Sequence, residues 1–175
     1  QQVARDIDNA KVSQVIYPLM QIEDVKSLRT NFVVAGTDQR KIYMLGMDIG
    51  KEVGIPEAVY LYTPIIPGLR GLGVKMSSSV SNSFISIRDK KEDIVRKINK
   101  AYCRIGDVEN NPVLSIMKLI VFPMFDKIEV GEISFEDYRS LEKEFEAGKL
   151  HPVDLKNAIA EYLEKIISPI RKSWK

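Results

Sequence analysis

The sequence contains one cysteine, Cys103, and one histidine, His151, among its 175 residues. These single residues exclude a disulfide within the chain, a zinc cluster of cysteines and histidines, and the paired histidines of the HExxH metalloproteases. We therefore expect no metal centre of these kinds. An unpaired thiol is typical of a reducing compartment, so we expect a cytoplasmic location.

Long apolar runs are also absent. No stretch approaches the roughly 18 residues that a membrane-spanning helix needs, so we expect no integral membrane protein. The chain opens Gln1-Gln2-Val3, without a starting methionine and without the basic segment and apolar run of a secretory signal. We expect it to be a processed or truncated piece of something longer.

Neither sign of charge is in clear excess. Lys and Arg total 26 and Asp and Glu total 24, which gives a net charge of +2. This balance does not predict nucleic-acid binding, which usually shows as a strongly basic face. A hydrophobic share of 45% and a charged share of 29% are typical of a globular chain. The length suits one ordinary domain or two small ones.

Short apolar runs alternate with helical patterns in the first half. The patterns predict a helix over 16–28, a buried strand over 32–35, a helix from Thr37 or Asp38 to about residue 53, and a strand over 58–63. Strand, helix and strand with short connections form the βαβ unit of a parallel sheet. A loop rich in proline, glycine and serine follows, and residues 84–87 could form a short strand.

The second half is helical. Apolar spacing predicts helices over 89–103, 111–122, 134–147 and from residue 150 onward, with a small hairpin within 127–133. We expect Ser134 to open a capping box, and Pro169 to disturb the last helix near its end. The change of class near residue 88 predicts a boundary between a domain of residues 1–88 and one of residues 89–175.

Three polar side chains share one face of the first predicted helix. Tyr17, Gln21 and Asp24 have the spacing i, i+4, i+7, which places them within an arc of roughly 60°. Such a hydrogen-bonding stripe could hold a small polar ligand. The plainer alternative is a solvated helix face with a packed tyrosine ring.

The segment from Gly36 to Lys41 follows a predicted strand and opens a helix. Ligands of parallel sheets bind beyond the carboxyl ends of the strands, and helix N-termini favour anions. Asp38 and Gln39 are therefore placed to face a crevice. An ordinary junction between strand and helix would explain the same residues.

A lysine and three serines follow Gly71 and Gly73 in the run Lys75-Met76-Ser77-Ser78-Ser79. The ammonium and the hydroxyls can follow a phosphate group whose charge and position change during a reaction. The alternative is a serine-rich surface loop, but this run should occur by chance in roughly one chain in ten thousand of this length.

This run resembles the second signature of the class I aminoacyl-tRNA synthetases, and the wider chain resembles the archaeal and eukaryotic type of tyrosyl-tRNA synthetase. The resemblance covers nearly all of the chain, in the family's order. The matching stretches are 15–24, 36–41, 75–79, 100–103, 108–112 and 151–158.

The resemblance implies an α/β fold: the C-terminal half of a Rossmann-like parallel-sheet catalytic domain over residues 1–88, with its KMSSS loop at 75–79, then an all-α helical anticodon-binding domain over residues 89–175. It implies a homodimeric enzyme that activates L-tyrosine with ATP and Mg²⁺ and transfers it to tRNA(Tyr). The family's first signature, a histidine-rich ATP-binding turn, is absent here. We therefore expect this chain alone to lack activation activity.

The resemblance also implies roles for the polar residues of the first half. Tyr17, Gln21 and Gln39 would surround the amino and carboxyl end of bound tyrosine, and Asp24 would accept its phenolic hydroxyl. A buried acceptor of this kind rejects phenylalanine, a rule for which tyrosyl-tRNA synthetases are themselves the standard illustration. Arg40 and Lys41 would contact the acceptor end of the tRNA.

The loop and the second half carry the remaining implied roles. Lys75 and Ser77, Ser78 and Ser79 would be catalytic, stabilising the pyrophosphate that leaves ATP, and Lys75 and Ser78 would bind ATP. His151 and Asp154 would belong to the anticodon-reading turn, with Asp154 accepting from a guanine.

The chain departs from the family pattern after Ser79, where Val80-Ser81-Asn82 replaces the common Lys-Gly-Asn. The segment 126–133 looks shortened, and the aromatic that stacks on the anticodon base is not identified. Three alternatives stay open: a tryptophanyl-tRNA synthetase, a non-catalytic tRNA-binding module, and an α/β protein with a coincidental loop.

Overall fold

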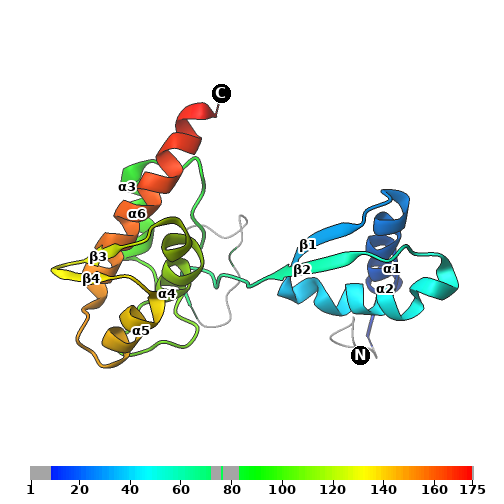
Figure 1. Cartoon of the computed structure of the whole chain (residues 1–175), viewed down its shortest axis with the longest axis horizontal. Helices are drawn as coiled ribbons and strands as arrows, with labels where there is room; N and C mark the ends of the chain where they lie inside the picture. The colour runs from blue at the N-terminus through cyan, green and yellow to red at the C-terminus, as the bar shows by residue number, and fades with distance from the viewer. Residues whose placement is uncertain (1–8, 72–75, 77–82, 175) are drawn as a thin grey trace. The chain divides into compact units, whose positions relative to one another are not determined.

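The chain forms two compact units, unit 1 with residues 1–65 and unit 2 with residues 66–175. The computed structural model describes residues 9–71, 76 and 83–174, and Figure 1 labels their helices and strands. The units divide well before residue 88, where the secondary structure changes class. The reason is that Leu69 is buried in the core of unit 2, where its carbonyl accepts the Tyr102 N–H at 2.7 Å.

Unit 1 is a βαβ unit with an additional helix before it. Its elements are α1 (Val12–Ser27), β1 (Phe32–Gly36), a 3-10 turn η1 (Thr37–Gln39), α2 (Arg40–Val53) and β2 (Val59–Thr63). The strands are parallel, with Phe32 opposite Val59 and Gly36 opposite Thr63. The predicted parallel sheet is therefore confirmed.

Local sequence explains where these helices begin, end and touch. The side chain of Gln14 accepts the Lys11 N–H at 2.9 Å, so α1 begins at Val12, before its predicted start, and Pro18 lies inside the helix rather than in its first turn. Gly54 ends α2 in the left-handed conformation, with φ of 70°. Gly46 lets α1 and α2 approach, because a Cβ there would lie 3.0 Å from Ile22.

Only one face of the sheet is covered. Tyr60 points to the covered face, where its ring centroid lies 5.0 Å from that of Tyr43 on α2. The opposite face exposes four apolar side chains, with exposed fractions of 53% for Phe32, 60% for Val34, 62% for Val59 and 48% for Leu61. The expectation that residues 32–35 form a strand buried on both faces is therefore wrong for the described chain.

Unit 2 packs its helices around one core. Its elements are α3 (Lys91–Asn99), α4 (Pro112–Ile116), a π-helical turn η2 (Met117–Val121), a 3-10 turn η3 (Phe122–Met124), β3 (Ile128–Val130), β4 (Ile133–Phe135), α5 (Tyr138–Glu146) and α6 (Pro152–Ser173). α3 lies along α6 (Figure 1). Ile94, Ile98, Phe145 and Ile159 are completely buried between these elements. No helix of the described residues is both long and apolar enough to cross a bilayer.

The predicted hairpin forms, as β3 pairs antiparallel with β4. Unit 2 is thus mainly helical rather than all-α. Ser134 lies in β4, so the helix after it begins later: Asp137 is the N-cap, and its Oδ1 accepts the Ser140 N–H at 2.9 Å.

Other predicted boundaries are wrong for local reasons. α3 ends at Asn99 and not at Cys103, because the Tyr102 N–H donates to Leu69 instead of back along the helix. Residues 84–87 form no strand, since the Ser86 N–H donates to Asp89 Oδ2 at 2.9 Å in a turn. The helix predicted over 111–122 is α-helical only to Ile116 and then widens into η2.

The last helix continues through Pro169 to Ser173, against expectation. A proline inside a helix removes one backbone hydrogen bond. Here the ion pair between Arg171 and Glu164, at 2.5 Å, spans that position. Ile167 also remains buried in the core beside it.

Candidate functional site

Gln21 and Gln39 come from different elements and meet in unit 1. Nε2 of Gln21, on α1, donates a hydrogen bond of 3.1 Å to Oε1 of Gln39, at the end of η1. Oε1 of Gln21 is shielded from solvent and has no hydrogen-bond partner among the residues that the structure describes. An unpaired buried acceptor costs about 1–3 kcal/mol, so this arrangement is typical of a site that a donor on a ligand completes.

Asp24 lies one helical turn from Gln21, on the same side of α1. It is exposed, so the expectation of a buried acceptor is wrong for the described chain. Gln21, Asp24 and Tyr43 line a shallow recess of about 280 Å³. The other residues that line it are Val25, Leu28, Thr30, Phe32, Val33 and Val34. A recess near the lower limit of ligand-pocket volumes, about 300 Å³, with a carboxylate and an amide at its wall, suits a small polar molecule with an apolar body.

Tyr17 lies on α1 at the predicted spacing, but 59% of its surface is exposed and it does not line this recess. The structure thus unites Gln21 with Gln39 by a hydrogen bond and with Asp24 by a shared recess. Tyr17 lies on the solvent-exposed part of α1, outside the recess.

The junction between β1 and α2 is shaped by Gly36. A Cβ at Gly36 would lie 2.6 Å from Oδ1 of Asp38, so the Asp38 carboxylate folds back over the glycine. Arg40 and Lys41 follow at the start of α2, and both are exposed. Two exposed cations beside the carboxyl end of β1 can meet an anionic partner there.

Tyr62 is a further candidate residue, which the sequence pattern did not single out. Its hydroxyl oxygen is shielded from solvent and has no hydrogen-bond partner in the described part of the chain. Burial raises the pKa of the Tyr62 phenol, the charge of Arg40 opposes that shift, and Tyr43 adds to it. The alternation Val59-Tyr60-Leu61-Tyr62 could have placed this side chain on the covered face at the end of β2.

The start of α6 presents a second polar group, in unit 2. His151 is the N-cap, and its Nδ1 accepts the Val153 N–H at 3.2 Å. Asp154 follows in the first turn, and both side chains are exposed. The turn of the β3–β4 hairpin lies beside them, because a Cβ at Gly131 would be 3.9 Å from Asp154. Hairpin turn and helix start therefore form one polar surface.

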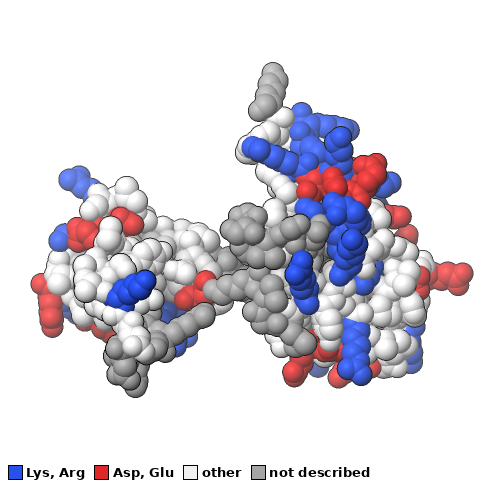
Figure 2. Space-filling view, turned by 180° about the vertical axis from the view of Figure 1, so that it is seen from behind, with Lys and Arg blue, Asp and Glu red and all other residues white. Residues whose placement is uncertain are grey.

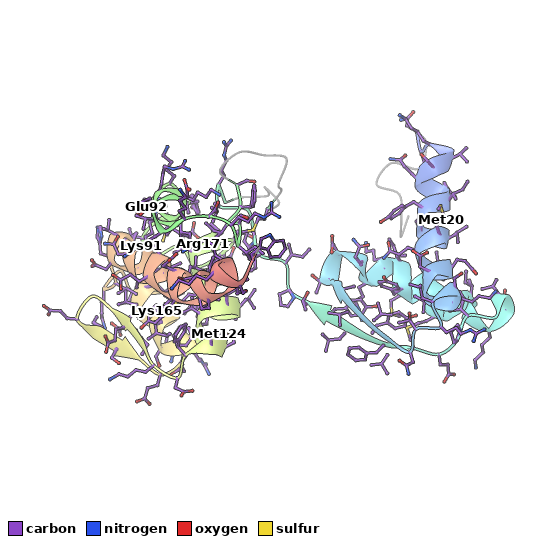
Figure 3. The ribbon with its side chains drawn as sticks, turned by 90° about the horizontal axis from the view of Figure 1, so that it is seen from above. Met20, Lys91, Glu92, Met124, Lys165 and Arg171 are labelled. Atoms are coloured by element: carbon purple, nitrogen blue, oxygen red, sulfur yellow. The ribbon has the colours of Figure 1, made fainter. Side chains whose placement is uncertain are left out.

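Basic side chains gather at the other end of α6, near the C-terminus (Figure 2). Arg171 pairs there with Glu164 and donates to the backbone carbonyl of Asp89. Figure 3 shows Lys91 and Glu92 near Arg171, and the charge of Glu92 acts on its guanidinium. Two acids, Glu164 and Glu92, thus lie among these bases.

The predicted catalytic residues Lys75, Ser77, Ser78 and Ser79 lie outside the described residues. Their roles stay predictions. Within the described ranges, no cluster of three or more His, Cys, Asp or Glu side chains could hold a metal ion.

The model of the family "tRNA synthetases class I (W and Y)" matches residues 1–168. The chain belongs to this family. It is 43% identical to the tyrosine–tRNA ligase of Methanosarcina acetivorans over 98% of the chain. It resembles the crystal structure of tyrosyl-tRNA synthetase from Aeropyrum pernix, with a TM-score of 0.86 and 39% identity over 97% of the chain. The synthetase from Archaeoglobus fulgidus, complexed with L-tyrosine, matches with a TM-score of 0.82 and 43% identity over 98% of the chain.

The chain spans about half the length of these relatives, namely 55%, 51% and 55% of them in the same order. The relatives confirm the resemblance to tyrosyl-tRNA synthetases and the α/β fold with a parallel sheet. The family model covers tryptophan and tyrosine enzymes, and the relatives named above are tyrosine enzymes. The division into a catalytic half-domain and an anticodon-binding domain stays a prediction, as do the roles of the site residues.

Proposed function

We propose that this chain is part of a tyrosine–tRNA ligase. The enzyme activates L-tyrosine with ATP to tyrosyl-adenylate and then transfers the tyrosyl group to tRNA(Tyr). The observation that carries the proposal is the Gln21–Gln39 pair, with its unpaired buried acceptor, in a chain 43% identical to such a ligase. A cytoplasmic homodimer, as the resemblance implies, is part of the proposal.

Tyrosine binds along α1. Its ammonium donates to Oε1 of Gln21, which satisfies the unpaired acceptor, while Gln39 holds the Gln21 amide in place. Asp24, on the wall of the same recess, accepts the phenolic hydroxyl. Tyr17 covers the amino-acid end from the neighbouring turn of the helix. Asp24 is exposed in the described chain, so the bound amino acid itself would shield the carboxylate from water. A ligand without the hydroxyl would then leave that carboxylate unpaired and be rejected.

Activation joins the tyrosine carboxylate to the α-phosphate of ATP. A carboxylate oxygen attacks the α-phosphorus, the bond to the bridging oxygen breaks, and pyrophosphate leaves with that electron pair. Lys75, Ser77, Ser78 and Ser79 stabilise the departing charge, and Lys75 with Ser78 binds ATP. Mg²⁺ accompanies ATP and is held mainly by its phosphates. Catalysis is positioning and electrostatic stabilisation, without a covalent enzyme intermediate.

Transfer RNA contacts residues of both units. Asp154 accepts from the N1–H and N2–H₂ groups of an anticodon guanine, and His151 stands beside it at the start of α6. Arg40 and Lys41 meet the phosphates of the acceptor end at the start of α2. The exposure of all four side chains is compatible with contact to a macromolecule.

The test is ATP–pyrophosphate exchange with the complete gene product, supplied with one amino acid at a time. Tyrosine should support exchange, and the 175-residue chain alone should not, because the first signature is absent from it. Exchange with tryptophan but not tyrosine would replace the proposal with the tryptophan alternative. Binding of tRNA without any exchange would make the protein a non-catalytic module.

A further inference from the structure

Two buried side-chain oxygens in the described residues lack a hydrogen-bond partner, and both belong to unit 1: Oε1 of Gln21 and the hydroxyl of Tyr62. The Gln21 oxygen has a role in the proposed site. The Tyr62 hydroxyl has none, although an unpaired buried hydroxyl carries the same kind of penalty.

The place of Tyr62 in the sheet is defined by its register. Tyr62 pairs with Ala35, one residue before the strand ends at Thr63, so its backbone lies at the carboxyl edge of the sheet. This is the edge at which ligands of parallel sheets bind. Arg40 and Tyr43, both in the first turn of α2, act electrostatically on its phenol. Gln39 directly precedes that turn.

The chemistry of this corner favours an anionic group of the ligand. A phenol is protonated at neutral pH, and the raised pKa of Tyr62 keeps it so. It can therefore donate to an oxygen that carries charge, and the nearby Arg40 cation favours the same ligand group.

We propose that Tyr62 is a further binding residue, whose hydroxyl donates a hydrogen bond to the carboxylate of the bound amino acid. The inference rests on the proposed function, since it takes the ligand to be tyrosine. It adds a contact to the end of the substrate that reacts.

Tyr62→Phe in the complete gene product is the test, with Tyr60→Phe as the matched control. Tyr60 lies on the same strand and the same face, two residues farther from the carboxyl edge. Calorimetry measures the affinity for L-tyrosine and for tyramine, which lacks the carboxylate. Tyr62→Phe should weaken tyrosine binding roughly tenfold, leave tyramine binding unchanged, and not lower the melting temperature, because the hydroxyl has no partner to lose. Tyr60→Phe should change neither affinity.

Other outcomes overturn the inference in distinguishable ways. If wild type binds tyrosine and Tyr62→Phe binds it equally well, Tyr62 is not a ligand group and the proposed function stands. If Tyr62→Phe lost affinity for tyrosine and for tyramine equally, or had a lower melting temperature, Tyr62 would have a structural role. If wild type binds neither molecule, the proposed function fails and the inference falls with it.

Discussion

The amide of Gln21 donates to the amide oxygen of Gln39 at 3.1 Å, across 18 residues of sequence and from helix α1 to the turn η1. The bond fixes the orientation of the Gln21 side chain, so that its own oxygen is held as an unpaired acceptor. A positioned acceptor binds a ligand more tightly than the same group on a freely rotating side chain. The reason is that the side chain has already lost its rotamer entropy before the ligand binds.

Gln39→Ala should therefore weaken tyrosine binding without removing an atom that meets the ammonium. We expect a loss of roughly tenfold, since one hydrogen bond that positions the Gln21 amide is lost. Calorimetric titration of the complete gene product with L-tyrosine measures it. Thr37→Ala, an exposed change in the same turn, is the control and should leave the affinity unchanged. An unaltered affinity in Gln39→Ala would show that the pair does not position the substrate.

Lys75→Ala should separate binding from chemistry. Lys75 is proposed to act on the leaving pyrophosphate, so its removal should slow adenylate formation while tyrosine affinity stays nearly intact. Single-turnover formation of tyrosyl-adenylate and equilibrium tyrosine binding are measured on the same preparation. A collapse of tyrosine affinity would contradict the assigned role.

Two helical glycines of α2 offer a matched test of the packing in unit 1. Gly50→Ala should stabilise the protein by up to about 1 kcal/mol, because alanine favours the helix and its Cβ would meet Ile55 at an ordinary 3.6 Å. Gly46→Ala adds a Cβ only 3.0 Å from the buried Ile22 and should be the less stable of the two variants. Thermal unfolding compares them. If Gly46→Ala were as stable as Gly50→Ala, the close approach of α1 and α2 would be wrong.

Asn111 is the N-cap of α4 in unit 2. Its Oδ1 accepts the N–H groups of Val113 and Leu114, and its Nδ2 donates to the Asp107 carbonyl at 2.9 Å. Only 1% of Asn111 is exposed, so Asn111→Ala leaves these groups buried without partners. We expect a loss of about 2–3 kcal/mol in the free energy of unfolding, measured with denaturant. Asn157→Ala, exposed on α6, is the control and should lie within about 0.5 kcal/mol of wild type.

Much of the fold follows from local pattern. The strands of unit 1, the helix between them and the hairpin of unit 2 form where apolar spacing and glycines predict them. The predicted cap at Thr37 or Asp38 is wrong, because these residues form η1 and α2 begins at Arg40 without a side-chain cap. The predicted helix boundaries are wrong where a tertiary contact determines where a helix begins or ends. The Tyr102 N–H bonds to Leu69 and shortens α3, and Ser134 joins β4, so that Asp137 caps α5 instead.

The candidate site was only partly predictable for a related reason. Helical spacing placed Gln21 and Asp24 on one side of α1, and the structure puts both on one recess. The spacing of one helix carries no information on what a neighbouring strand contributes. Tyr62 was therefore missed, because its significance depends on an unpaired hydroxyl that shows only when β2 is placed against α2.

The most direct test of the central claim measures the preference for tyrosine over phenylalanine in wild type and in Asp24→Asn, with the complete gene product and the exchange assay. Wild type should prefer tyrosine strongly, and Asp24→Asn should lower that preference by roughly 10- to 100-fold, because the hydroxyl loses a charged acceptor. Glu23→Gln, which neutralises the exposed acid next to Asp24, should retain the wild-type preference. An unchanged preference in Asp24→Asn would contradict the claim that the α1 recess recognises the phenolic hydroxyl of tyrosine.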